Sequence, residues 1–326
     1  MLSRRHALGL AAGLGAATLR PGPAAAQGAY PDRPVRYIVP FPPAGLTDIM
    51  ARFMAQKLSE IWGKPVVVEN RPGGNALIGA DAAAKAPADG YTLLAITLTH
   101  AVNVSLFPQA PYDLRRDFVP VSVLGSLPLV VVVNANSPIR RLDELLARAK
   151  TEQMNGGSSG NGSPPHLGLE LFRRVAGAGA NLVHVPYRGG APSVTDLVAG
   201  NLQLMVSNLP ECIGQIRSGR LRGLAITSDR RHALVPDIPT VREAGAPGLE
   251  MTNWTAMLTN AAVPPPVIAA IERATLAAIA DPEVKRKAEE GGFDVLGWDA
   301  RKSREFLDGE TRRWAQLVAE AGIKAD

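Results

Sequence analysis

The chain of 326 residues has one cysteine, Cys212, so it offers neither a disulfide framework nor a cysteine cluster for zinc. It also lacks a strong charge of either sign, because 30 residues are acidic and three of the 35 basic residues lie in an N-terminal leader. That balance does not predict nucleic-acid binding. Beyond Gln27, no run of about 18 apolar residues is free of charge, which argues against a transmembrane helix in the mature chain.

Patterns for metals and cofactors are missing as well. The five histidines are scattered, without a His-Glu-x-x-His pattern or carboxylates at matching spacing. No Gly-x-Gly-x-x-Gly opens a helix, and no P-loop lysine follows a glycine-rich loop. We therefore expect no metal and no cofactor.

The first 26 residues have the order of an export signal. They contain the basic pair Arg4 and Arg5, an apolar run over residues 7–19, and three alanines before Gln27. The weak hydrophobicity of the run and Arg20 after it resemble a twin-arginine signal more than a general secretory one. We expect cleavage after residue 26 and a soluble periplasmic protein of a Gram-negative bacterium.

The full chain has the composition of an ordinary globular protein, with 46% apolar and 20% charged residues. Its 32 glycines and 27 prolines indicate many short elements joined by turns. Strands alternate with helices, which predicts parallel sheets in two α/β domains. Strands are expected at residues 35–39, 65–69, 91–96, 129–133, 182–185, 204–207 and 221–227. Helices are expected after residue 45, before residue 85, and at 142–150, 166–176, 193–199, 265–280 and 300–321.

The last two predicted helices bring no strands with them, so we expect them to cover the first sheet. This arrangement makes the first domain discontinuous, with residues 27–127 plus 251–326, and assigns residues 128–250 to the second. Two crossings then form a hinge, and ligands are expected in the cleft beyond the carboxyl ends of the strands.

The loop PFPPAGLTD, residues 40–48, connects the first strand to a helix. Prolines stiffen it, its glycine lets backbone amides approach a ligand, and the free amides of the first helical turn would attract a carboxylate. Thr47 or Asp48 is expected to cap the helix, and a plain N-cap is the alternative interpretation.

The loop GGSSGNGS, residues 156–163, fits Ser163 as an N-cap and Pro164 as the first helical residue. Its amides and hydroxyls suit an anion, and a flexible surface turn is the alternative. The loop also matches the G-x-S-x-G pattern of a serine hydrolase around Ser158, with Asp196 and His232 following in order. Because residues 153–155 make a poor strand and the prolines delay the helix, we do not expect an enzyme.

A third loop, VPYRGGAPS at residues 185–193, leads another strand into a helix. Tyr187 offers an aromatic wall, and Arg188 is either a carboxylate partner or a solvated surface residue. We interpret His184 as a core histidine. Residues after the third strand are candidates for the cleft: Thr97, Thr99 and His100.

Several ordered motifs from about Tyr30 to the C-terminus support one family. They are PFPPAGLTD (40–48), VVVENRPG (66–73), DGYTLL (89–94), SSGNGS (158–163) followed by His166 and Leu167, VPYRG (185–189), PTV (239–241) and EAG (243–245). Together they resemble the Bug-type solute-binding receptors of tripartite tricarboxylate transporters. The resemblance implies the type II periplasmic binding protein fold: two α/β domains joined by two crossing hinge strands, with a ligand cleft between them.

The resemblance also implies a site in which backbone amides and bridging waters hold a carboxylate. It carries over the ligand-binding residues Phe41, Ala44, Thr47, Asp48, Ser158, Gly160, Gly162, Ser163, Tyr187, Gly189, Ser207 and Asn208, to which Thr97, Thr99, His100 and Arg188 are added from the loops. The family usually has Gly-Gly at residues 44–45 and lysine at 188. It often has an acidic residue at position 207 that can hold an amino group, so Ser207 argues against an amino-acid ligand.

The predicted function is an extracytoplasmic receptor that captures a small organic carboxylate and delivers it to the membrane permease subunits of a tripartite transporter. A monomer is expected, since the receptor must open and close. Two alternatives remain: a ligand-binding partner of a sensor histidine kinase, and a periplasmic serine hydrolase that uses Ser158.

Overall fold

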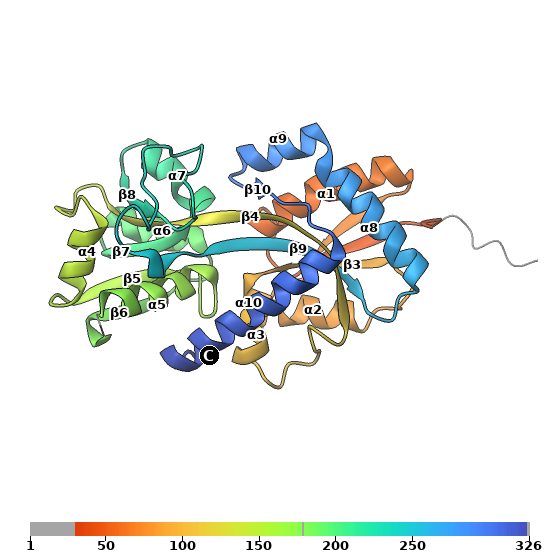
Figure 1. The fold of residues 1–326 in the computed structure, drawn as a ribbon, viewed down its shortest axis with the longest axis horizontal. Helices are drawn as coiled ribbons and strands as arrows, with labels where there is room; N and C mark the ends of the chain where they lie inside the picture. The colour runs from red at the N-terminus through yellow and green to blue at the C-terminus, as the bar shows by residue number, and fades with distance from the viewer. Residues whose placement is uncertain (1–29, 178, 325–326) are drawn as a thin grey trace, which may run out of the picture.

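The computed structural model describes residues 30–177 and 179–324, so the predicted export signal lies outside the described residues. Two α/β lobes are connected by β4 (Phe118–Asn134) and β9 (Thr252–Asn260), which pair antiparallel and run between the lobes (Figure 1). One ten-stranded sheet results, in the order β2-β1-β3-β9-β4-β7-β5-β6, with β8 and β10 also paired to β4. The predicted α/β fold with two crossing strands is confirmed.

The first lobe is built on parallel strands. β1 pairs in parallel with β2 and β3, and β3 pairs antiparallel with β9. Met50, Met54 and Leu58 of α1 are fully buried, as their spacing on one helical face predicts. The elements are β1 (Val35–Val39), α1 (Leu46–Trp62), β2 (Val66–Asn70), α2 (Leu77–Ala84), β3 (Thr92–Thr97), α3 (Leu98–Leu106), α8 (Pro265–Ala280), α9 (Pro282–Glu290), β10 (Asp294–Val295) and α10 (Ala300–Ala321).

The second lobe repeats the arrangement. β5 lies between β6 and β7 and is parallel to both, and β7 and β8 pair antiparallel with β4. The elements are α4 (Leu142–Ala149), β5 (Met154–Ser158), α5 (Pro164–Ala176), β6 (Leu182–Pro186), α6 (Gly190–Ala199), β7 (Leu204–Asn208), α7 (Leu209–Arg217) and β8 (Leu221–Ile226), with short 3₁₀ turns at Gly179–Asn181 and Pro247–Leu249.

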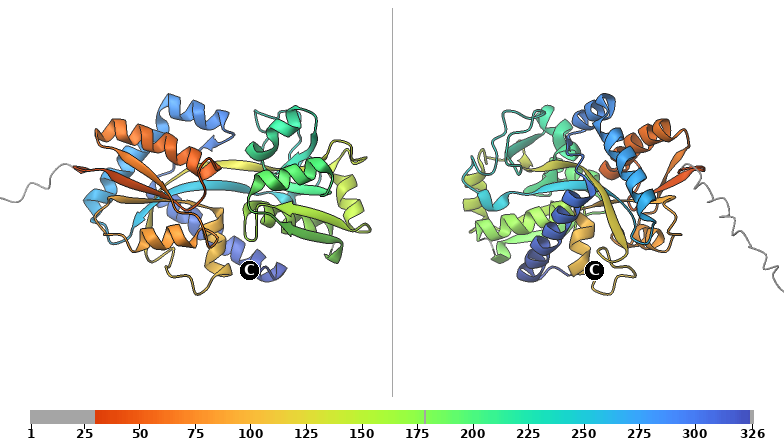
Figure 2. Two further views of the ribbon diagram at one scale, coloured as in Figure 1. Left: turned by 180° about the vertical axis from the view of Figure 1, so that it is seen from behind. Right: turned by 45° about the vertical axis from the view of Figure 1, so that its right-hand side comes forward.

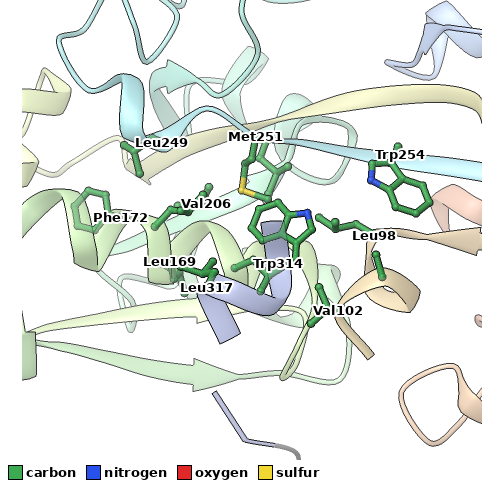
Figure 3. Close-up of a cluster of buried hydrophobic side chains, with 14 of the residues drawn as sticks. Leu98, Val102, Leu169, Phe172, Val206, Leu249, Met251, Trp254, Trp314 and Leu317 are labelled. Carbon is green, nitrogen blue, oxygen red and sulfur yellow. The ribbon is translucent and has the colours of Figure 1, made fainter. Parts of the chain in front are cut away.

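Hydrophobic packing differs on the two faces of the sheet. On one face, α2, α3, α4, α5 and α10 share a single core that passes from one lobe to the other. Figure 3 shows part of this core, in which Leu98 and Val102 of the first lobe lie on one side of Trp314 and Leu169 and Phe172 of the second lobe lie on the other. On the opposite face the core is split: α1, α8 and α9 cover the first lobe, and α6 and α7 cover the second. The hydrophobic core therefore runs through both lobes on one face and is divided between them on the other.

Helix α10 connects the lobes more than the sequence indicates. It packs on α3 and β4, and its C-terminal part continues beneath the second lobe (Figure 2). Glu310 accepts hydrogen bonds from Trp254 Nε1 and Trp314 Nε1 at 2.8 and 2.9 Å. Near its end, Glu320 forms an ion pair with Arg174 of α5 at 2.9 Å. The expectation that the C-terminal helices cover only the first sheet is therefore incomplete for α10.

The residues before Ser158 form a strand, contrary to the interpretation of residues 153–155 as a poor one. Gly156 and Gly157 explain the difference, because both are buried where neighbouring elements approach closely. A Cβ atom on Gly157 would overlap Leu202 and lie 2.5 Å from Ser193 Oγ of α6. Glycine weakens a strand in isolation, but here it lets α6 pack directly on β5.

Across residues 30–177 and 179–324, none of the helices has the length and apolar character that crossing a membrane requires. The same part of the chain holds no group of three or more His, Cys, Asp or Glu residues arranged to bind a metal ion.

Candidate ligand-binding site

Loops of both lobes meet between the lobes at the carboxyl ends of the parallel strands. The Gly162 backbone packs against the first lobe, since an added Cβ atom would lie 2.8 Å from Leu106 Cδ2 and 3.1 Å from Asn75 Nδ2. At another edge, a Cβ on Gly292 of the first lobe would lie 3.0 Å from Pro210 Cγ of α7. The lobes are thus in contact at two edges, and the loops predicted to bind a ligand lie at this boundary.

In the first loop, Asp48 organises the backbone. The helix N-cap is Gly45 and has no side-chain cap, so the expectation that Thr47 or Asp48 caps α1 is wrong. Asp48, three residues inside the helix, is 1% exposed and accepts from the Ala44 amide at 2.9 Å. Its carboxylate also accepts from Arg52 Nε and Asn70 Nδ2, both at 2.8 Å. Asp48 therefore fixes the loop and leaves the N-terminus of α1 without a side-chain cap.

Electrostatics keep Asp48 ionised in this network. Burial alone would raise the pKa of its carboxyl, but hydrogen bonds from Arg52, Asn70 and the Ala44 amide hold the pKa below its ordinary value. The same Asn70 amide donates to the Phe41 carbonyl at 3.1 Å, so one side chain ties both ends of the loop together. Ala44 has φ 63°, a left-handed conformation in which glycine would be unstrained.

Residues after the third strand form α3, which the sequence interpretation missed. Thr97 is its N-cap, and the Thr97 amide donates to His100 Nδ1 at 3.2 Å. The His100 ring is fully buried, lies edge-on to Phe41 at 5.9 Å between centroids, and borders a cavity of about 90 Å³ with Asn103 and Tyr112. Burial lowers the pKa of His100 to about 3, so the ring is neutral. His100 lies behind the first loop, and Thr97 and Thr99 are also buried.

The second loop follows β5 and enters α5. Ser163 is the N-cap, its Oγ accepts from the His166 amide at 3.4 Å, and Pro164 is the first helical residue, as predicted. The Ser163 hydroxyl also donates to the Gly160 carbonyl at 2.6 Å. Gly160 and Gly162 have φ values of 121° and 69°, so both need glycine. The Ser159 hydroxyl, which the sequence interpretation did not select, is buried and has no hydrogen-bond partner among residues 30–177 and 179–324.

Two histidines hold the second loop from behind. Gly162 donates its amide hydrogen to His166 Nδ1 at 3.0 Å, and His184 Nε2 lies 2.6 Å from Ser158 Oγ. The two rings stack, with centroids 3.8 Å apart and an interplanar angle of 9°. Burial and the neighbouring His166 lower the pKa of His184 to about 4. His184 is thus a supporting residue, close to its interpretation as a core histidine.

The proposed hydrolase triad does not assemble. Asp196 accepts from the Tyr187 hydroxyl at 2.6 Å, and His232 Nδ1 accepts from the Leu234 amide at 3.3 Å. The histidine beside Ser158 is His184, and Ser158 is 0% exposed. The structure therefore lacks the predicted arrangement of Ser158 with Asp196 and His232 within its described residues.

The third loop lies beside the second. The Tyr187 amide donates to the Ser158 carbonyl at 3.0 Å, which extends the pairing of β5 with β6 beyond the strands. Burial and the hydrogen bond to Asp196 raise the pKa of Tyr187 to about 12, so it remains a neutral hydroxyl. Arg188 is exposed, and Gly189, with φ 110°, is the N-cap of α6. Only Arg188 of these residues brings a charge to the loop.

The end of β7 brings in a residue that the sequence interpretation missed. Ser207 and Asn208 are buried, and Asn253 Nδ2 of hinge strand β9 donates to Asn208 Oδ1 at 3.2 Å. Asn208 Nδ2 donates to Glu211 Oε1 at 3.1 Å, and Ser207 Oγ donates to Glu211 Oε2 at 3.4 Å. Glu211 could have been found from its spacing of four residues from Ser207, because residues four apart lie on the same side of a helix. That argument requires helix α7, which the sequence interpretation did not predict.

Comparison with known proteins identifies the family of this chain. The model of the tripartite tricarboxylate transporter family receptor matches residues 50–323. Protein BugT of Bordetella pertussis is 40% identical over 300 residues, which cover 90% of this chain and 91% of that protein. A solved Rhodopseudomonas palustris protein with adipate is 32% identical, with a TM-score of 0.82 over 90% of this chain and 99% of the other.

A second solved structure, MatC from R. palustris with bound malate, is 27% identical, with a TM-score of 0.79 over 89% of this chain and 100% of the other. The fold, the motifs and the relatives agree on one class of protein. This chain belongs to the tripartite tricarboxylate transporter receptor family and is a Bug-type periplasmic solute-binding receptor.

Proposed function

We propose that this receptor captures a small organic carboxylate between its lobes and delivers it to the membrane permease subunits of a tripartite transporter. One observation carries the proposal: a loop of each lobe turns backbone toward the lobe boundary at a helix N-terminus, and buried side chains fix both loops from behind. Helix N-termini attract anions without a cationic side chain. The adipate and malate bound by the two structural relatives support this class of ligand.

The roles of the predicted residues divide into contact and support. We assign ligand contact to the loop backbone around Ala44, Gly160 and Gly162, whose own amide hydrogens are donated to Asp48, Ser158 and His166. The Tyr187 ring and polar groups of Ser207 and Asn208 are assigned to the ligand as well. Support falls to side chains that hold those groups in place: Asp48, His100, Ser158 and Ser163. Phe41, Thr47, Thr97, Thr99, Arg188 and Gly189 complete the proposed site as its walls and rim.

We also propose where the receptor acts and how its chain is divided into two lobes. The receptor acts as a periplasmic monomer after removal of residues 1–26. Its lobes correspond to residues 27–127 plus 251–326 and residues 128–250. Strands β4 and β9 supply the hinge, and the split core on one face of the sheet leaves the lobes free to separate there.

A thermal-shift screen tests the proposed function. Residues 27–326 would be purified through unfolding and refolding to strip any bound ligand, then heated with a panel of mono-, di- and tricarboxylates. A ligand at 100 times its Kd adds about 2.7 kcal/mol, which raises Tm measurably. We expect stabilisation by at least one carboxylate. Stabilisation only by neutral or cationic compounds would contradict the proposal.

A further inference from the structure

Glu211 places a carboxylate at the lobe boundary. It lies in the first turn of α7, next to Pro210, which approaches Gly292 of the first lobe. Its carboxylate also packs against Gly190, the first residue of α6, where an added Cβ atom would overlap the carboxylate oxygens. Because α6 and α7 both begin at carboxyl ends of parallel strands, Glu211 sits between two loops that are proposed to line the ligand.

The hydrogen bonding of this carboxylate is incomplete. Its two donors are Ser207 Oγ and Asn208 Nδ2, at 3.4 and 3.1 Å. Within residues 30–177 and 179–324, no Lys, Arg or His nitrogen lies within 4.0 Å of it. An ionised carboxylate accepts about four hydrogen bonds, so capacity remains for another donor.

The local environment contrasts with that of Asp48, whose carboxylate has a guanidinium, an amide side chain and a backbone amide as donors. Burial raises the pKa of Glu211, which marks a carboxylate that lacks such compensation. A partly buried acid without a cationic partner is unfavourable in the empty protein. A ligand that brings a donor would remove that penalty.

We propose that Glu211 selects ligands which carry an ammonium group at the end remote from the bound carboxylate. This inference rests on the proposed carboxylate-receptor function and narrows its substrate class to amino-substituted acids. The Glu211 carboxylate reaches Ser207 from one helical turn away, so the end of β7 has an acidic group beside it although residue 207 is serine. A second carboxylate at this end of a ligand would face Glu211 and be repelled.

Three matched pairs of probes test the selection: succinate with 4-aminobutyrate, glutarate with 5-aminovalerate, and terephthalate with 4-(aminomethyl)benzoate. Within each pair the number of carbon atoms is the same, and a CH2–NH3⁺ group replaces one carboxylate. Calorimetric titration of the refolded protein is expected to show that the amine binds at least tenfold more tightly in the pair that fits the site. The variant Glu211→Gln is expected to reduce that preference at least tenfold.

Glu152→Gln is the matched control, because Glu152 is an exposed residue of the same lobe that pairs with Arg148 at 3.7 Å. It is expected to keep the wild-type preference. Since the wild-type comparison needs no mutation, the inference stays testable even if Glu211→Gln fails to fold.

Other outcomes separate the inference from the function on which it rests. Tighter binding of the dicarboxylate in every pair that binds would overturn the role of Glu211 and leave the carboxylate receptor intact. An amine preference that survives Glu211→Gln would also overturn it. If no carboxylate in these pairs or in the thermal-shift panel binds, the proposed function itself fails.

Discussion

The two loops proposed to hold the carboxylate present similar backbone geometry through different chemistry. In the first loop, residues 40–48, the buried carboxylate of Asp48 is surrounded by charged and polar donors. In the second loop, residues 158–163, two stacked histidines take the place of that network. The first loop is thus held by the ionised carboxylate of Asp48. The second is held by imidazole rings, which accept hydrogen bonds only through unprotonated nitrogens.

This difference shows that polar residues in a binding loop need not touch the ligand. Asp48 and His100 both carry chemistry that suits a ligand, yet both accept hydrogen bonds from the protein itself. Asp48 accepts from the Ala44 amide, Arg52 and Asn70, and His100 accepts from the Thr97 amide. The two kinds of support should also respond differently to mutation and to pH.

The largest expected effect comes from removing the ionic support. Asp48→Ala deletes the acceptor of three donors, leaves the Ala44 amide without that acceptor, and removes one of the hydrogen bonds of Asn70. We expect a loss of about 2–4 kcal/mol of unfolding free energy and at least a hundredfold loss of carboxylate affinity. Thermal melts and titrations of the variant measure both.

Asp143→Ala is the control for this variant, since Asp143 is exposed and its pair with Arg141 lies on the surface. It should change neither property appreciably. Unchanged affinity in Asp48→Ala would show that the first loop does not need its buried acid.

The second expected effect concerns contact between the lobes. In Gly162→Ala, the new methyl group meets Leu106 and Asn75 of the first lobe, so closure is hindered. We expect at least a tenfold loss of affinity in addition to the strain of a left-handed alanine. Gly177→Ala has a similar φ, 63°, but no atom within 4 Å of the added Cβ. Equal affinities of the two variants would argue against closure through Gly162.

The third expected effect is a dependence of stability on pH that comes from the second loop. His184 has a pKa of about 4 in the folded protein and about 6.5 when unfolded. Between these values the unfolded chain binds more protons, so stability falls as pH drops from 6.5 to 4.

Because the His184 ring is partly exposed, we expect it to contribute about 1 kcal/mol, or about 2–4 °C in Tm. Thermal melts of the wild type and of His184→Gln at pH 7.5 and 4.5 measure this contribution as the difference between their changes in Tm. The contribution of the buried His100 is the same in both proteins and cancels. Asp48 should add nothing in this window, because its pKa lies below the ordinary value. A slope unchanged in His184→Gln would contradict the assignment.

The smallest expected effect is at Ala44. Ala44→Gly removes the strain of a left-handed alanine but adds freedom to the unfolded chain, so we expect a net gain of about 0.5 kcal/mol. Ala76→Gly is the control, with φ 71° outside the loop. Affinity that changes in Ala44→Gly but not in Ala76→Gly would place residue 44 in the site. A loss of stability in Ala44→Gly would refute the strain argument.

Much of the fold was predictable because its helices and parallel strands carry clear periodicity. Helices α8 and α10 have the bounds that the sequence predicts. The first half of β4 was not found, because Pro120 and Pro128 interrupt the strand pattern and the register shifts between Pro120 and Ser122. Helix α7 was also missed, and with it Glu211.

The loops of the candidate site were predictable from glycine, proline and helix starts. The direction of their side chains was not, because it depends on partners far apart in sequence. Asp48 is seen to support its loop only once its hydrogen bond from Asn70 is known. In the same way, the supporting role of Ser158 follows from its hydrogen bond with His184. Side-chain chemistry alone therefore selected the loops but did not show which of their side chains hydrogen-bond to the protein itself.

The most direct test of the central claim is small-angle X-ray scattering of the refolded, ligand-free protein before and after saturation with the tightest carboxylate from the screen. If the two loops share one ligand, its addition should bring the lobes together and decrease the radius of gyration in the wild type but not in Gly162→Ala. Saturable binding with no change in the radius of gyration would contradict capture between the lobes.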